Sequence, residues 1–165
     1  VSSPHRRHRL EDDSVMGLHH QNDPDLIRAL LMDPGTWAVV GLSSNRARTA
    51  HGVSRWLQVE LGKPIIPVHP SAEPVHGATG YATLADIPDT DVKVVDCFVN
   101  STHVGAVVDQ AIEQRERLGI DAIWMQLGVV DEAAASRARA VGIDVVMDTC
   151  PKIEWPRLRH EGMQR

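Results

Sequence analysis

The segment from residue 41 to residue 49 combines small, polar and basic side chains in a pattern suited to binding phosphate. Its members, in order, include Gly41, Ser43, Ser44, Asn45, Arg46 and Arg48. A glycine lets the backbone approach a ligand closely, the hydroxyl and amide groups can donate hydrogen bonds, and the arginines add positive charge. The alternative for this segment is an ordinary polar loop with exposed arginines.

The elements around this segment favour the phosphate interpretation. A continuous apolar run at 37–41 ends in glycine and predicts a buried strand, and apolar residues at helical spacing predict a helix over 50–61. The segment would then lead into a helix N-terminus, where free backbone N–H groups and the helix dipole attract anions.

Strands and helices alternate along the rest of the chain. Strands are predicted at 37–41, 65–68, 92–98, 122–126 and 143–147, with a short one near 80–83; helices are predicted at 24–33, 50–61, 103–118 and 131–141, with a helical turn at 151–158. This alternation with short connections predicts an α/β domain of Rossmann type, with a doubly wound, mostly parallel sheet.

The length of 165 residues, with 42% hydrophobic and 24% charged residues, fits one globular domain. We expect a polar, flexible tail at 1–23, the domain at 24–158 and a C-terminal tail at 159–165. The first tail holds four of the nine histidines, but without a fixed scaffold they predict no metal site.

The composition also limits the partners. A net charge of −5 and 4% aromatic residues disfavour nucleic acid. No apolar stretch is long enough to span a membrane, and none resembles a secretory signal. Two cysteines are too few for a disulfide framework, so we expect a cytoplasmic protein.

In a doubly wound sheet, ligands bind beyond the carboxyl ends of the strands. A dinucleotide site normally has an acidic residue after the second strand to hold the ribose hydroxyls, and it carries two further glycines in the first loop. Here His69 and Pro70 follow the second strand, and Ser43 and Arg46 replace those glycines. NAD is therefore a less favoured ligand than another nucleotide.

Five segments at strand ends, taken together, resemble the stand-alone CoA-binding protein family. They are AVVGLS at 38–43, PVHP at 67–70, VDCFVN at 95–100, WMQLG at 124–128 and VVMDTC at 145–150. The resemblance covers about residues 24–158, and the family in turn resembles the CoA-binding domain of succinyl-CoA synthetase α subunits. It implies a Rossmann-type fold and coenzyme A, or an acyl-CoA, as the ligand.

The resemblance also implies roles for individual residues. The diphosphate would contact Gly41, Ser43, Ser44, Asn45 and Arg46. The adenosine side would be lined by Val68, His69 and Pro70. The entrance for the pantetheine arm would be lined by Val99, Asn100 and Ser101 on one side and by Gln126 and Gly128 on the other. Ser101 or Thr102 is equally interpretable as a helix N-cap. Family members often carry Ser-Tyr where this chain has Ala50 and His51, which puts the role of that helical turn in question.

Four residues near strand ends have competing structural roles. Cys97 lies within a strand and is predicted to be core. Asp96 and Asp148 could orient a ligand, but capping of loops is the favoured role. Cys150, with Lys152 two residues further on, could be a reactive thiol, although packing is favoured.

We therefore expect a small binding module for CoA or a short acyl-CoA. The ligases that share this domain use a phosphorylated histidine from a second domain, for which the sequence after the predicted domain leaves no room. Two alternatives stay open. One is an acyl-CoA-dependent enzyme using Cys150 or His103; the other is a nucleotide-sensing Rossmann protein similar to redox repressors, which is disfavoured because no winged-helix segment is predicted.

Overall fold

A five-stranded parallel sheet forms the centre of the protein. The structure is a computed structural model and describes residues 21–164, so that most of the predicted N-terminal tail, with its four histidines, lies outside the described residues. All strand pairs are parallel, in the order β2-β1-β3-β4-β5. The strands are β1 (Trp37–Val40), β2 (Ile65–Val68), β3 (Val94–Cys97), β4 (Ala122–Met125) and β5 (Asp144–Val146).

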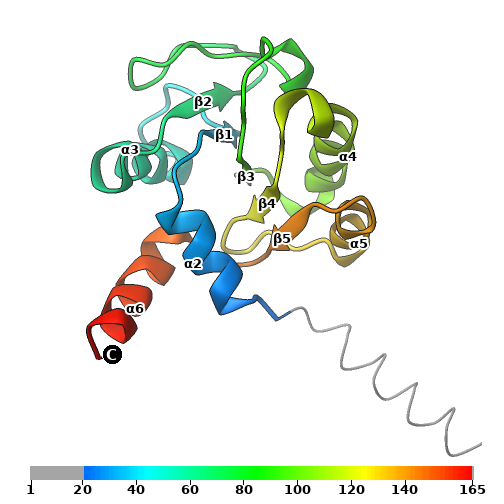
Figure 1. Ribbon diagram of the computed structural model, residues 1–165. Helices are drawn as coiled ribbons and strands as arrows, with labels where there is room; N and C mark the ends of the chain where they lie inside the picture. The colour runs from blue at the N-terminus through cyan, green and yellow to red at the C-terminus, as the bar shows by residue number, and fades with distance from the viewer. Residues whose placement is uncertain (1–20, 165) are drawn as a thin grey trace, which may run out of the picture.

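Helices cover both faces of the sheet, as Figure 1 shows. They are α2 (Pro24–Met32), α3 (Thr49–Leu61), α4 (Ser101–Leu118), α5 (Glu132–Ala140) and α6 (Pro151–Gln164), with a 3₁₀ turn η1 (Leu84–Asp86). One core cluster joins the sheet to α4, α5 and η1, and the other joins it to α2, α3 and α6. This confirms the predicted Rossmann-type α/β fold. None of the helices between residues 21 and 164 is long and apolar enough to cross a membrane.

Strand residues alternate between these two faces because successive side chains in a strand point in opposite directions. On β3, Val95 and Cys97 belong to the α4 and α5 side, whereas Val94 belongs to the side of α2, α3 and α6. By this alternation, Asp96 also faces α2, α3 and α6. Cys97 is completely buried, which confirms its predicted core role.

The strand order reverses between β1 and β3. From β1 the chain continues to β2 at one edge, and from β3 it continues to β4 on the other side. The connections after β1 and β3 therefore diverge, and the crevice they leave at the carboxyl ends is where such folds place ligands. The fold thus brings the 41–49 segment beside the segment that follows β3.

Three local predictions differ from the structure. In place of the strand near 80–83, there is a single bridge between Tyr81 and Val68, and the 3₁₀ turn η1 begins soon after it. Helix α4 begins at Ser101, so its N-cap is Asn100 rather than Ser101 or Thr102. In addition, α6 continues well beyond the predicted turn at 151–158, to Gln164.

Asn22, just before α2, is hydrogen-bonded to the residue that follows β5. Its side-chain amide donates to the Met147 carbonyl at 2.8 Å, and its amide oxygen accepts from the Met147 N–H at 2.9 Å. Met147 is buried, so no solvent replaces these bonds readily. The contact holds in place the strand end from which residues 148–150 leave the sheet.

We expect Asn22→Ala to lower the free energy of unfolding by about 1–3 kcal/mol, because two backbone groups of a buried residue lose their partners. Urea denaturation followed by circular dichroism would measure the change. Gln21→Ala, at the exposed neighbouring position, is the control and should be near neutral. Equal stability of the two variants would contradict the proposed anchoring.

Candidate functional site

Two cavities open at the carboxyl edge of the sheet. Cavity one, of about 680 Å³, extends from the 41–50 segment to α6, and cavity two, of about 700 Å³, extends from the same segment toward the residues after β2. Both volumes suit a small-molecule ligand. The cavities meet at residues that line both of them, namely Gly41, Arg48, Phe98, Val99 and Asn100.

Gly41 is required where β1 leaves the sheet beside β3. Its φ is +99°, and a Cβ on this residue would lie 2.6 Å from the carbonyl oxygen of Phe98. Its N–H donates to the Val68 carbonyl at 2.7 Å. The glycine therefore allows three neighbouring strand ends to approach one another, and a substitution there would disturb the sheet as well as any ligand contact.

The segment after Gly41 leads into α3 as the sequence predicts. Ser43 and Asn45 stabilise the turn, because the Asn45 N–H donates to Ser43 Oγ at 3.2 Å and the Ala47 N–H donates to Asn45 Oδ1 at 3.0 Å. The N-cap of α3 is Arg48, and no side chain caps this helix. First-turn N–H groups are thus left to attract an anion, beside a guanidinium that lines both cavities.

Ser44 and Arg46 line neither cavity. The Ser44 hydroxyl instead donates to Glu73 Oε2 at 2.7 Å, which ties the β1 loop to the long loop after β2. Hydrogen bonds from Ser44 and Ser71 lower the pKa of the Glu73 carboxyl, so the carboxylate that accepts them is favoured. This contact orders the outer wall of the site.

The end of β2 and the residues after it form one wall of cavity two. Val68, His69 and Pro70 all line it, together with His103 of α4. The His69 N–H donates to the Tyr81 carbonyl, and its ring Nδ1 lies 2.9 Å from Ser71 Oγ. These bonds orient the imidazole at the cavity wall.

A buried carboxyl lies behind the inner end of cavity one. Gln126 Nε2 donates to Asp96 Oδ1 at 2.5 Å, and Asp96 Oδ2 has no hydrogen-bond partner among the described residues. Asp96 is completely buried, and burial raises its pKa from 3.8 to about 8. The acid is therefore mostly protonated at neutral pH, and its role is to hold Gln126 rather than to cap a loop, which corrects the favoured expectation.

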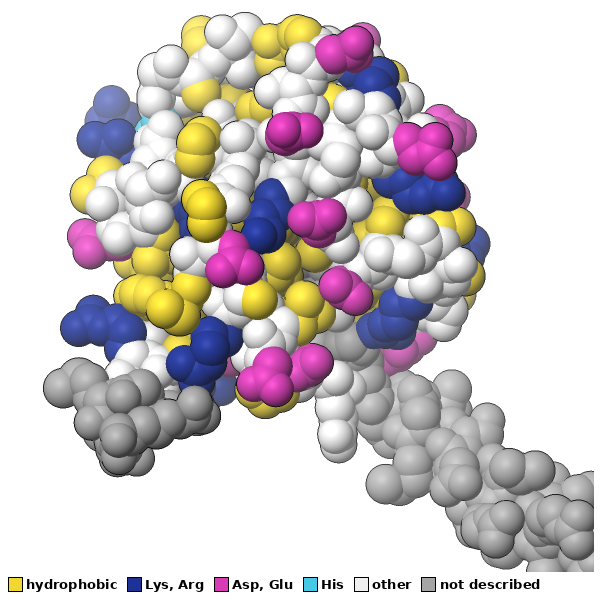
Figure 2. Space-filling model, in the orientation of Figure 1, with side chains coloured by type: hydrophobic (Ala, Val, Ile, Leu, Met, Phe, Trp, Pro, Cys, Tyr) yellow, Lys and Arg dark blue, Asp and Glu magenta, His cyan; other side chains and the backbone are white. Residues whose placement is uncertain are grey.

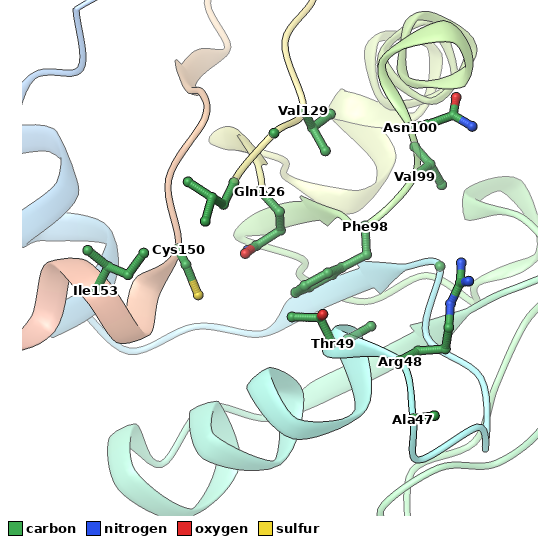
Figure 3. Close-up of a pocket in the computed structure, with 14 residues that line it drawn as sticks. Ala47, Arg48, Thr49, Phe98, Val99, Asn100, Gln126, Val129, Cys150 and Ile153 are labelled. Atoms are coloured by element: carbon green, nitrogen blue, oxygen red, sulfur yellow. The ribbon is translucent and has the colours of Figure 1, made fainter.

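Cys150 faces the same end of cavity one. Figure 3 shows the side chains of Gln126, Cys150, Phe98 and Thr49 around a common space. Burial raises the pKa of the Cys150 thiol, although backbone N–H groups of Lys152 and Ile153 act in the opposite direction. The thiol form is therefore favoured, as the predicted packing role requires.

The turn after β4 is held from two sides. The Gly128 N–H donates to Asp148 Oδ1 at 2.7 Å, and Asp148 itself has a φ of 59°. Ser101 Oγ donates to the Gly128 carbonyl and accepts from the Val130 N–H. Asp148 thus has its expected loop-stabilising role, and Ser101 supports the turn from outside the cavities.

Ten of the thirteen residues proposed from sequence line one of the cavities or both. Cavity one contains Gln126 and Gly128, cavity two contains Ser43, Asn45, Val68, His69 and Pro70, and Gly41, Val99 and Asn100 line both. Ser44, Arg46 and Ser101 are the three that do not. No group of three or more His, Cys, Asp or Glu side chains among residues 21–164 could hold a metal ion.

Sequence reasoning missed several lining residues. Phe98 lines both cavities, Ile153 lines cavity one and Thr83 lines cavity two. Phe98 stands inside one of the motifs and could have been found there. Ile153 and Thr83 reach the site only because α6 and the long loop after β2 fold back over the sheet edge, which no local pattern indicates.

The doubly wound sheet and the paired cavities at its switch point define a Rossmann-like α/β domain with its candidate site at the carboxyl edge. The family model of the CoA binding domain matches residues 35–156. The chain therefore belongs to the CoA-binding domain family.

Individual relatives agree with this assignment. The uncharacterized protein YneT of Bacillus subtilis is 32% identical over 127 residues, which cover 77% of this chain and 90% of YneT. A hypothetical protein from Pyrococcus horikoshii has a TM-score of 0.74 and 32% identity, over 83% of this chain and 92% of that one. A dinucleotide-forming acetyl-coenzyme A synthetase of Ca. Korarchaeum cryptofilum has a TM-score of 0.59 at 23% identity, covering 72% of this chain and 26% of the synthetase; this likeness shows the fold alone.

The buried acid makes stability depend on pH in a defined direction. An aspartate in the unfolded chain titrates near 3.9, whereas folding raises the pKa of Asp96 to about 8. Between these values the folded state retains a proton that the unfolded state has released, so the free energy of unfolding falls as pH rises.

Asp96→Asn removes this dependence. We therefore compare the free energy of unfolding of the wild type with that of the variant. From pH 5 to pH 8 we expect the wild-type value to fall, relative to the variant value, by an amount on the order of 3 kcal/mol. Urea denaturation at both pH values would measure it, with Asp121→Asn as an exposed-carboxyl control. A difference that does not vary with pH would show that Asp96 is ionised in the folded protein.

Proposed function

We propose that this protein binds coenzyme A, or a short acyl-CoA, as a small binding module. The observation that carries the proposal is the arrangement of two cavities around one anion-attracting point. Coenzyme A has a nucleotide at one end, a pantetheine arm at the other and a diphosphate between them. Arg48 and the uncapped start of α3 lie where the two cavities meet, which suits that central diphosphate.

Each cavity would hold one end of the ligand. In this proposal the adenosine occupies cavity two against Val68, His69 and Pro70. The pantetheine arm passes Val99 and Asn100 and ends in cavity one between Gln126 and Cys150. Ser44, Arg46 and Ser101, which line neither cavity, have supporting roles.

The two candidate catalytic residues lie in different cavities, which favours a binding module over an enzyme. Cys150 lines cavity one, whereas His103 lines cavity two. The raised pKa of the Cys150 thiol also disfavours the thiolate that a nucleophile requires. Incubation with acetyl-CoA should therefore leave the intact mass of the protein unchanged, and a stoichiometric acyl adduct lost in Cys150→Ser would overturn this part of the proposal.

The proposed setting is the cytoplasm, with a small molecule rather than nucleic acid as the ligand. The sequence holds only two cysteines, too few for the disulfide framework of a small secreted protein, which supports this setting. On the face drawn in Figure 2, acidic and basic side chains are interspersed, without the broad basic surface that a nucleic-acid backbone attracts.

We expect coenzyme A to bind more tightly than NAD. Since His69 and Pro70 stand where a dinucleotide site needs an acid for the ribose hydroxyls, NAD loses that recognition. Isothermal titration calorimetry with each ligand would compare the two Kd values, after native mass spectrometry has identified any molecule that copurifies. Equal or tighter binding of NAD would falsify the assignment to coenzyme A.

Arg48→Gln should weaken coenzyme A binding by about tenfold to a hundredfold, because a hydrogen-bonded guanidinium at the diphosphate contributes roughly 1.5–3 kcal/mol. The remaining binding should also depend less on salt concentration. Arg55→Gln makes the same charge change at an exposed position of α3 that lines neither cavity. If the two variants bind equally well, the diphosphate does not lie at Arg48.

A further inference from the structure

Of the two cysteines of the chain, only Cys150 can be reached by a ligand in cavity one. It lines this cavity, and Figure 3 shows its sulfur facing the same space as the side chains of Gln126 and Phe98. Cys97 is completely buried and lines neither cavity. The protein therefore carries one accessible thiol at the proposed pantetheine end and one inaccessible thiol behind it in the sheet.

The start of α6 is directed at the Cys150 sulfur. The backbone N–H groups of Lys152 and Ile153 point to Sγ, and the positive charge of Lys152 acts on the same thiol. These interactions favour the thiolate, whereas burial and Asp96 favour the thiol. Burial is the largest of these effects, so the resting group is a thiol, but a thiolate that forms during a reaction has donors beside it.

An unpartnered acceptor faces the same end of the cavity. Gln126 is only 4% exposed, and its Nε2 is used by Asp96. No donor among residues 21–164 reaches its Oε1, and Figure 3 shows this oxygen on the side of the cavity toward Cys150. A buried amide oxygen without a partner suits a ligand that brings an N–H group. The pantetheine arm brings one, in the amide two carbon atoms from its sulfur, and a hydrogen bond from this amide would leave that sulfur at the Cys150 end.

We propose that Cys150 is a site of reversible disulfide exchange with coenzyme A, through which oxidised coenzyme A becomes linked to the protein. This inference rests on the proposed function, because it takes the diphosphate at Arg48 and the pantetheine arm in cavity one as given. It adds a covalent modification site to the binding module.

The reaction exchanges one disulfide for another. The Cys150 thiol loses its proton, and the thiolate attacks the nearer sulfur of CoA disulfide, in which two CoA molecules are joined through their sulfurs. A bond forms between Sγ and that sulfur while the original S–S bond breaks, and the second CoA leaves with the electron pair and takes up a proton. Cys150 is thereby oxidised and the departing CoA is reduced. An excess of a small dithiol reverses the reaction.

Binding of the nucleotide makes the exchange selective. Because the raised pKa of the Cys150 thiol disfavours the thiolate, a disulfide that meets it only by diffusion should react slowly. A disulfide held at Arg48 by its diphosphate stays beside the thiol, which raises its effective concentration there. The exchange forms no oxyanion, so it does not need the donors that attack on a thioester requires, and the predicted absence of an acetyl adduct still holds.

Intact-mass spectrometry of the full, reduced chain after incubation with CoA disulfide tests the inference. We expect one adduct, with the mass of CoA less two hydrogen atoms, which dithiothreitol removes and which Cys150→Ser does not form. Peptide mapping should find it on Cys150 and leave Cys97 unmodified. If the protein binds CoA in calorimetry but forms no adduct on Cys150, this inference is overturned while the proposed function stands. If it neither binds CoA nor forms the adduct, the proposed function itself fails.

Pantethine, the disulfide of the pantetheine arm alone, is the matched control for the ligand. It has the same reactive end as CoA disulfide but lacks the nucleotide and the diphosphate. We expect CoA disulfide to modify Cys150 at least about tenfold faster than pantethine at equal concentration, because only CoA disulfide is held in the site. Equal rates would show that Cys150 reacts as an ordinary accessible thiol, and would overturn its assignment as a site for coenzyme A.

Discussion

The close approach of Gly41 to the carbonyl of Phe98 is the constraint on which the site depends. A Cβ at residue 41 would lie 2.6 Å from that carbonyl oxygen, too close for any side chain, so β1 and β3 can end in this way only with glycine there. At this point the strand order also reverses. The two strand ends therefore meet at the point where their loops diverge, and the Phe98–Asn100 segment that follows β3 lines both cavities.

A second constraint acts from within the sheet. Asp96 occupies a position that alternation would assign to an apolar residue, and its carboxyl is completely buried. A buried acid lowers its energetic penalty by staying protonated and by finding a hydrogen-bond partner. Gln126 is that partner, so the orientation of a cavity-wall amide is determined by a strand residue that does not itself line the cavity. The buried acid therefore lowers the stability of the fold but fixes the orientation of the Gln126 side chain.

The sequence predicts the fold more completely than the site, for a physical reason. Strand and helix periodicity is local, so the five strands and their helices could be located to within a few residues, and glycine and polar residues at strand ends indicated the 41–49 segment. Contacts between distant segments leave no such pattern. Ser44 was predicted to face the ligand but binds Glu73, 29 residues away. Ile153 enters cavity one only because α6 packs back against the sheet edge. The sequence favours a capping role for Asp96 because no local pattern shows that Gln126, 30 residues away, lies beside its carboxyl.

The distribution of charge gives the site a direction. The guanidinium of Arg48 and the first turn of α3 lie where the cavities meet, and polarity falls from there toward Cys150 and Ile153. An anion is therefore attracted to the middle of the site. A ligand with a charged centre therefore fits with that centre at Arg48, because moving the charge further into cavity one would place a strongly hydrated group beside Phe98 and Val129. Arg48 is the one charged residue among the described residues that line cavity one, so it determines where the charged part of a ligand lies and leaves the far end of the cavity to the less polar part.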